Sequence, residues 1–489
     1  MKHLFFYPSI AMSPVIEIAL AKSIELDGQI SYVKFTPTSI CRSQYNPSAD
    51  PILHAYTLAR QHSFLSNLIS EMGCRPLIIK YSQINLFSGV LEKSHLERIH
   101  ASVMSSIASL TRSRSLDSLS PFWQVLYKRL VTQSIQYLRF LLYHLDNSSI
   151  TDVHLFNGRF FDALPARLAA EITGINYHVS DVKYSRSFYS FTNVSLHSIE
   201  ANHTKMIAHA ELRPDLLSLS EQYFYDRRFG KRTYEKAFTS GQTRGYKGSC
   251  YRLDSKHIIS IFPSSDDEYR YLASDWNIPT VNQADEIYLL ANSLIDLPYH
   301  IVVRMHPNMA GCPTSDLSDF YSLSRLPNVT VLKPESPEDT YAVMDIASIC
   351  VVFCSSMAIE CNYWRKPLIL IGPSPYIKTN LGSFCQNGLE ASALISSHRV
   401  TLGERQLSLK WASYLLYYND HLPRFIASDG SYSVKGCKVL TYSLLRFLCL
   451  PSKILLNLHK PQIAKKPSNS IRYMINGLKR VLLGKWSDV

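Results

Sequence analysis

Two short stretches decide the fold of this chain: residues 301–308, IVVRMHPN, and residues 349–360, ICVVFCSSMAIE. Each opens with a run of β-branched and other apolar residues, which predicts a strand buried on both faces. Each then turns polar where that strand ends. Because ligands bind at the carboxyl ends of strands in open α/β sheets, the pair predicts a Rossmann-like sheet with a binding site at that edge.

Strand-length apolar runs alternate with helical patterns along most of the chain. The expected strands are 4–7, 30–35, 77–79, 152–156, 176–179, 257–262, 300–305, 329–332, 349–353 and 368–371. Such alternation predicts an α/β fold with parallel pairing and right-handed crossovers. We expect an N-terminal Rossmann-like domain over 1–240 with a helical insertion at about 51–145, and a second over 241–425. Weak patterning between about 210 and 251 predicts the linker.

The helix expected after Ser355-Ser356 is the clearest candidate site. Backbone N–H groups at a helix start, joined by serine hydroxyls, suit a phosphate, and Glu360 would then be free for ribose hydroxyls. The alternative is that a serine only caps the helix. A capping box places the acid three residues after the serine, whereas Glu360 lies four after Ser356 and five after Ser355.

A second group of polar residues follows the strand near 300–305. Arg304 and His306 occupy alternate positions, which point to one side of a strand, and Pro307 holds His306 extended. Together they predict an anion site, although a lone histidine is often without a special task. Ser264 and Ser265 follow the strand at 257–262 and are kept as binding residues, although Ser265 also has the spacing of a capping box with Glu268.

These residues carry a resemblance to a known family. The pair His306-Pro307, the Ser-Ser-x-x-x-Glu pattern ending at Glu360 with Lys366-Pro367 after it, residues 261–268 (IFPSSDDE) and Asn157-Gly158-Arg159 together resemble bacterial capsule and surface-polysaccharide glycosyltransferases of GT-B architecture. That group includes Kdo transferases and polysialyltransferases, which use CMP-activated sugars. The resemblance covers roughly residues 150–390.

The resemblance implies two Rossmann-like domains facing across a cleft and transfer of a sugar from a nucleotide donor, a CMP-sugar being favoured, to a capsule or lipopolysaccharide glycan. His306, Ser355 and Ser356 would contact the donor phosphate, and Glu360 the ribose. Retaining relatives often carry a second glutamate eight positions earlier, where this chain has Val352. CDP-glycerol or polyol-phosphate transferases share the His-Pro and serine features and stay an alternative, as does a non-catalytic glycan-assembly protein.

Transfer also needs a base for the acceptor hydroxyl, a carboxylate or histidine in the first domain. Asp162 is our candidate and Asp181 its rival, although Asp162 could be a helix cap. Asn157 and Gly158 suit a turn, while Arg159 would offer a cation to donor or acceptor. The chain has no Asp-x-Asp pair, and protein cations and helix dipoles can stabilise a leaving phosphate, so we expect no metal and no cofactor beyond the donor.

Composition narrows the class of protein. With 489 residues, 46% hydrophobic and 18% charged, the chain is neither disordered nor fibrous. Its ten cysteines are scattered without metal or redox spacing, which indicates reduced thiols in the cytoplasm. No run approaches the roughly 18 apolar residues of a membrane span.

The last segment, 426–489, concentrates part of the net charge of +12. Apolar residues at 471, 474, 475, 478, 481 and 482 fit one face of a helix, with lysines and arginines between them. A basic amphipathic helix suits an anionic membrane surface such as the inner face of the inner membrane. Docking on the protein's own body is the alternative. Nucleic acid is not expected, because no recognition motif accompanies the charge.

Overall fold

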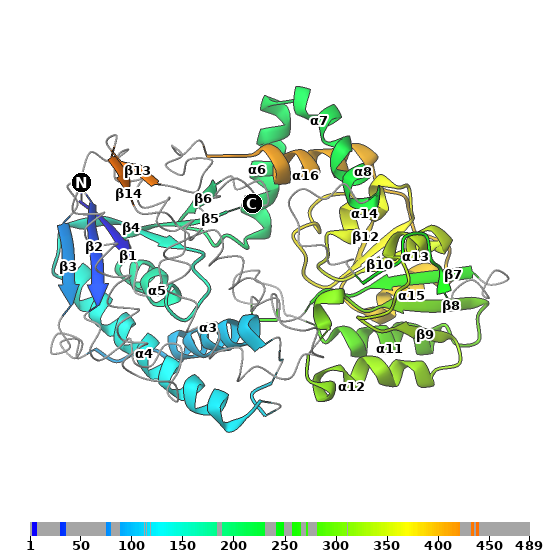
Figure 1. Cartoon of the computed structure of the whole chain (residues 1–489), viewed down its shortest axis with the longest axis horizontal. Coiled ribbons are helices and arrows are strands. Elements are labelled where there is room, and N and C mark those ends of the chain that lie inside the picture. The colour runs from blue at the N-terminus through cyan, green and yellow to red at the C-terminus, as the bar shows by residue number, and fades with distance from the viewer. Residues whose placement is uncertain are drawn as a thin grey trace, which may run out of the picture.

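The computed structural model describes residues 2–6, 30–35, 75–79, 89–111, 113, 115–117, 119–182, 188–229, 241–248, 257–265, 270–271, 281–310, 312–420, 432–434 and 437–439. Within them the chain forms two six-stranded sheets, each with helices packed on it, that lie side by side (Figure 1). The first part of the expected helical insertion, residues 51–74, and nearly all of the basic tail lie outside the described residues.

The first sheet has the order β3-β2-β1-β4-β5-β6. Its strands are β1 (Lys2–Phe6), β2 (Ile30–Phe35), β3 (Arg75–Ile79), β4 (Ile150–Phe156), β5 (Asn176–Val182) and β6 (Phe188–Thr192). All neighbours pair in parallel except β5 and β6, which are antiparallel. The order is that of the Rossmann fold.

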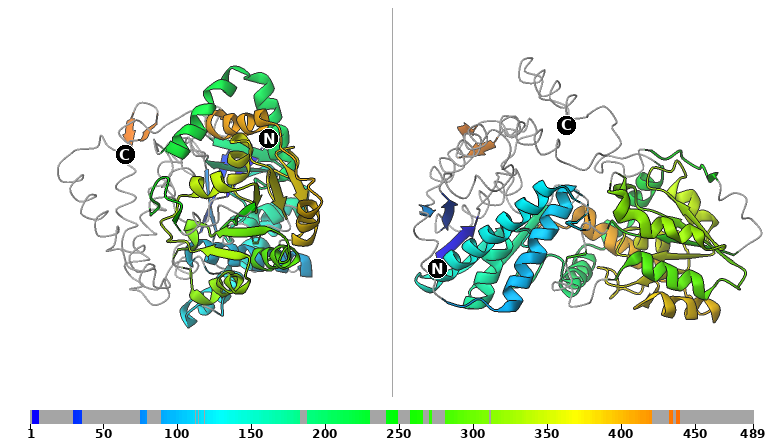
Figure 2. Two further views of the ribbon diagram at one scale, coloured as in Figure 1. Left: turned by 90° about the vertical axis from the view of Figure 1, so that its right-hand side faces the viewer. Right: turned by 90° about the horizontal axis from the view of Figure 1, so that it is seen from below.

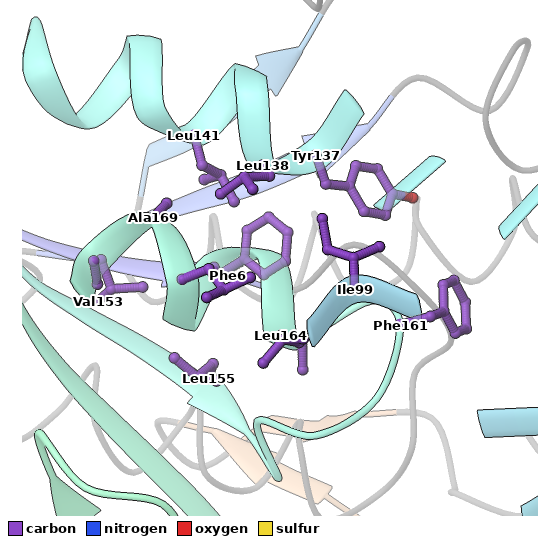
Figure 3. Packing of buried hydrophobic residues seen from close by; sticks show 14 of the residues in the cluster. Phe6, Ile99, Tyr137, Leu138, Leu141, Val153, Leu155, Phe161, Leu164 and Ala169 are labelled. Carbon is purple, nitrogen blue, oxygen red and sulfur yellow. The ribbon is translucent and has the colours of Figure 1, made fainter. Parts of the chain in front are cut away.

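Among the described residues, helices α3 (Lys93–Thr111), α4 (Pro121–Asp146) and α5 (Leu164–Thr173) pack against this sheet. Leu138 and Leu141 of α4 point toward Phe6 of β1 and Val153 of β4 (Figure 3), and all four are buried. Each such side chain contributes about 1.5–3 kcal/mol. The helix α5 ends at Gly174, whose positive φ of 71° favours glycine.

The second sheet has the order β12-β11-β10-β7-β8-β9, all parallel. Its strands are β7 (His257–Phe262), β8 (Tyr299–Arg304), β9 (Val329–Leu332), β10 (Ile349–Val352), β11 (Leu368–Ile371) and β12 (Ser383–Cys385). In chain order this is again the Rossmann arrangement. The predicted α/β fold with two Rossmann-like domains is therefore confirmed.

Helices cover both faces of the second sheet. One core cluster includes α11 (Gln283–Ser293), α12 (Thr314–Ser322) and α15 (Gly388–Ser396). The other includes α13 (Thr340–Ile346), α14 (Met357–Tyr363) and α16 (Arg405–Tyr417). Short 3₁₀ helices, η4 (Pro307–Met309) and η5 (Leu323–Arg325), follow β8 and α12. Because both faces are covered, the strands are continuous apolar runs.

The described part of the stretch expected as a linker is largely helical. After α6 (Ile199–Leu212) come α7 (Asp215–Leu219) and α8 (Glu221–Phe229). Met206 of α6 and Phe224 of α8 belong to a core cluster of the second sheet. Helix α16 lies beside α6 (Figure 2), with His209 and Ser413 joined by a 3.0 Å hydrogen bond. The domain bounds 1–240 and 241–425 stay predictions.

At the carboxyl end of the described residues, β13 (Tyr432–Val434) and β14 (Cys437–Val439) form an antiparallel pair. None of the helices in the described ranges combines the length and apolar character that crossing a bilayer requires.

Candidate functional site

The strand order of the second sheet brings most of the predicted residues to one edge. β7 lies between β10 and β8. From β7 the chain adds β8 and β9 on one side, and then β10, β11 and β12 on the other side, so the strand order reverses between β7 and β10. The N–H of Phe353 donates to Phe262 O at 3.3 Å, so the two strands end together. The serine pairs 264–265 and 355–356 follow these ends, and His306 follows β8. This is the switch point at which such sheets bind ligands.

The two serines after β10 have different local roles. Ser355 Oγ accepts from the N–H of Met357 at 3.3 Å. Ser356 directly precedes α14 but makes no side-chain cap. The capping alternative therefore describes Ser355 and does not describe Ser356. Cys354, which leads into this turn, has a positive φ of 37°, a conformation that is uncommon outside glycine.

Glu360 is not free for ribose hydroxyls as expected from the sequence. Its side chain is 0% exposed, and Oε1 accepts from Arg227 Nε of α8 at 2.9 Å. Oε2 accepts from the hydroxyl of Tyr341 on α13. Burial, and then the charge of Glu360, raises the pKa of Tyr341 well above its ordinary value, so the phenol stays protonated and donates. A carboxylate fully removed from water requires such partners.

Arg227 also reaches the predicted phosphate site. Its Nη2 donates to Ser356 Oγ at 3.2 Å, and its guanidinium lies 5.2 Å from the centre of the Tyr223 ring. Sequence reasoning missed Arg227 and Tyr341. Arg227 stands in a charged run, 226–232, that reads as a linker, and nothing in that run indicates a partner in α14.

Arg304 and His306 do not share one strand, because β8 ends at Arg304. The Arg304 side chain is buried, and its Nη1 and Nη2 donate to the carbonyls of Lys333 at 2.6 Å and Ser336 at 3.2 Å. It thus ties the end of β8 to the turn after β9. His306 is half-buried and precedes η4, where its Nδ1 accepts from Asn308 N at 3.1 Å. That bond assigns the proton of a neutral His306 to Nε2.

Ser264 and Ser265 are both buried at the end of β7. Gln283, the first residue of α11, accepts from the N–H of Ser264 at 2.9 Å and donates to its Oγ at 3.1 Å. The capping partner proposed for Ser265, Glu268, lies outside the described residues. The structure brings Ser264 to the same edge as Ser355 and His306, held by Gln283.

The first sheet brings together a different set. Asn157 and Gly158, with φ of 61° and 78°, turn the chain at the end of β4. Asn157 Nδ2 donates to Asp181 Oδ2 at 2.6 Å, so Asn157 and the rival base are neighbours. Arg159 donates weakly to Ser109 Oγ at 3.4 Å and lies over the Phe160 ring at 4.5 Å.

Asp162 lies in the turn that precedes α5. The residue directly before that helix is Ala163, one position after Asp162. Asp162 and Asp181 both remain predictions for the base.

Among the described residues, no group of three or more His, Cys, Asp or Glu side chains is arranged to hold a metal ion. Metal independence stays a prediction.

Comparison with known proteins gives structural likeness alone. No family model matches the sequence, and no curated protein matches it. The calicheamicin glycosyltransferase CalG4 has 13% identity and a TM-score of 0.28, over 85% of this chain and 94% of that chain. KpsC of Thermosulfurimonas dismutans, a beta Kdo 2,4 transferase, has 14% identity and a TM-score of 0.35, over 61% and 87%.

A third solved structure, S. aureus MnaA with UDP, has 10% identity and a TM-score of 0.27, over 86% of this chain and 97% of that chain. The first of these is named a glycosyltransferase and the second a Kdo transferase. At such low TM-scores the strand order, and not the likeness, carries the assignment of the fold.

Proposed function

We propose that this chain is a glycosyltransferase of GT-B type, which moves a sugar from a nucleotide-activated donor to a bacterial surface glycan. A single observation carries the proposal: the ends of β7, β10 and β8 are adjacent, so that Ser264, Ser356 and His306 gather at the switch point of a Rossmann sheet. Serine hydroxyls, backbone N–H groups and an imidazole at that place suit the phosphate of a nucleotide.

In the proposed reaction His306 stabilises the departing phosphate. With Nδ1 accepting from Asn308, the neutral ring presents Nε2–H as its donor to the departing phosphate. Arg304 serves by holding the strand end, since its donors are directed to the carbonyls of Lys333 and Ser336. Asp162, or its rival Asp181, takes the proton from the acceptor hydroxyl, and Asn157 and Arg159 border the acceptor side.

The finer parts of the proposal concern donor, acceptor and location. A CMP-sugar is the favoured donor and a capsule or lipopolysaccharide glycan, free or linked to lipid, the favoured acceptor. No metal or resident cofactor is part of the proposal. The protein would act in the cytoplasm, with its basic tail on the anionic inner face of the inner membrane.

Nucleotide binding tests the proposal most directly. A ligand that binds only the folded state raises its stability by RT ln(1 + [L]/Kd), so CMP, CDP, UDP and GDP should be compared by thermal shift on the full chain. We expect CMP to give the largest shift. A flat response to all four would reject the proposal. Slow hydrolysis of CDP-glycerol without hydrolysis of any CMP-sugar would instead assign a polyol-phosphate transferase.

A further inference from the structure

Helices α6, α7 and α8, which follow the first sheet in the sequence and precede the second, are called here the connecting helices. One side chain of α8, Arg227, contacts residues of the candidate site at the second sheet. Arg227 lies 129 residues from Ser356 and 133 from Glu360 in the sequence, yet it donates to both side chains. Its side chain is 20% exposed, whereas that of Glu360 is 0% exposed. The guanidinium therefore lies between a fully buried carboxylate and the serine at the start of α14.

Glu360 and Tyr341 hold Arg227 in one orientation. The Nε–H is committed to Glu360 Oε1 at 2.9 Å, and Tyr341 donates to the other carboxylate oxygen. A planar guanidinium fixed by one N–H has the directions of its other N–H groups fixed as well. The Nη2–H group is thus directed at Ser356 Oγ, to which it donates.

This contact determines what the Ser356 hydroxyl can do. A hydroxyl has one O–H donor and two acceptor lone pairs. Because Ser356 Oγ accepts from Arg227, the O–H of Ser356 is not used in that contact. The hydroxyl is then polarised by a cation and presents its O–H as a donor, which suits an anion.

We propose that Arg227 is a positioning residue that orients and polarises Ser356 as a hydrogen-bond donor to the donor nucleotide's phosphate. The inference rests on the proposed function and deepens it, because it makes a residue of the connecting helix part of phosphate recognition. Arg227 acts through Ser356, and Glu360 acts through Arg227.

A double-mutant cycle on the full chain tests the relay, with CMP as the probe and the dissociation constant measured by titration calorimetry. Ser356→Ala and Arg227→Lys should each weaken CMP binding about tenfold, the loss of one charge-assisted hydrogen bond. Lysine keeps a charge for Glu360 but lacks the fork that reaches Ser356. The double variant should also be about tenfold weaker, because both changes remove the same interaction.

A variant that replaces both members of the Arg227–Glu360 ion pair by neutral residues controls for loss of the fold. Arg227→Gln combined with Glu360→Gln leaves no uncompensated charge and should weaken CMP binding to the same extent, with the melting temperature measured without nucleotide for each variant. Arg228→Lys, next in the sequence and paired with Asp345 at 2.6 Å, is the matched control and should bind CMP as the wild type does.

The outcomes separate the two proposals. If wild-type protein binds CMP and the single effects multiply to about a hundredfold, Arg227 acts independently of Ser356 and the relay is overturned. Unchanged CMP affinity in the Arg227 variants overturns it as well. If wild-type protein binds none of CMP, CDP, UDP and GDP, the proposed function fails and the relay fails with it.

Discussion

Arg227 of α8 and Glu360 of α14 form an ion pair of 2.9 Å across 133 residues of sequence. Its carboxylate is fully buried and its guanidinium is four-fifths buried, with 20% of the side chain exposed. The pair fastens the connecting helices to the second domain at the point where the candidate phosphate site begins. The packing of α8 on the second domain and the geometry of the candidate phosphate site thus depend on the same ion pair.

Removing the cation should destabilise the protein strongly. Arg227→Ala leaves the Glu360 carboxylate buried without its charge partner, a change that costs about 3 kcal/mol. We expect a loss of that size in the free energy of unfolding, measured with urea.

Asp345→Asn provides the matched control, because it breaks the ion pair between Asp345 and Arg228, the residue next to Arg227. The side chain of Asp345 is 43% exposed. Exposed pairs contribute about 0.5 kcal/mol. Equal losses in the two variants would contradict a special role for the buried pair.

His306 can be tested for chemistry apart from its structural contact. His306→Ala should abolish transfer, while loss of the hydrogen bond to Asn308 costs about 1 kcal/mol of stability. His306→Asn supplies another side-chain acceptor at the cap position and should restore stability without restoring transfer. Transfer at near-normal rates in the Asn variant would limit His306 to a cap.

The sequence predicted the second sheet well because its strands are continuous apolar runs. Leu368–Ile371 is buried at every position, so its continuous apolar sequence was enough to predict a strand without an alternating apolar and polar pattern. The predicted bounds of its neighbouring strands agree with the structure within a residue or two. The three-residue strand Ser383–Cys385 at the sheet edge has no such run and was not predicted. The predicted helix after Ser356 is confirmed as α14, Met357–Tyr363.

The connecting helices could not be predicted because their apolar partners are distant in sequence. Helix α8 is dominated by charged and polar residues, and Phe224 is buried by stacking on Tyr363, with ring centroids 3.8 Å apart. The same distance in sequence concealed the partner of Glu360. Residue spacing indicated a carboxylate near the serines, but only tertiary packing decides whether that carboxylate meets a ligand or an arginine.

The basic tail gives a prediction that concerns the membrane. Deleting the residues after 452 removes Lys453, Lys460, Lys465, Lys466, Arg472, Lys479, Arg480 and Lys485. Each basic residue near an anionic surface contributes about 1 kcal/mol, so the truncated protein should no longer sediment with phosphatidylserine vesicles. Its melting temperature should be unchanged. A large fall in melting temperature would instead assign the tail to packing on the protein's own body.

Glu171 of α5 should make stability depend on acid. It accepts from Arg98 of α3 at 2.7 Å and from Arg167 at 2.8 Å. Burial alone would raise the pKa of Glu171, but the hydrogen bond from Arg98 and the charges of both arginines outweigh it, so the pKa lies below its ordinary 4.5. The unfolded chain therefore binds the proton more readily than the folded one, and acid favours unfolding.

The stabilisation from Glu171 is fully present above its ordinary pKa of 4.5 and is lost as the pH falls through the lower value of the folded protein. Glu171→Gln should cost about 2 kcal/mol at neutral pH, and urea unfolding should show the gap to wild type closing in acid. Glu97→Gln is the control, because its pair with Lys93 is 66% and 91% exposed, and it should shift stability little at any pH. A gap for Glu171→Gln that stays constant into acid would show that packing, and not charge, joins α3 to α5.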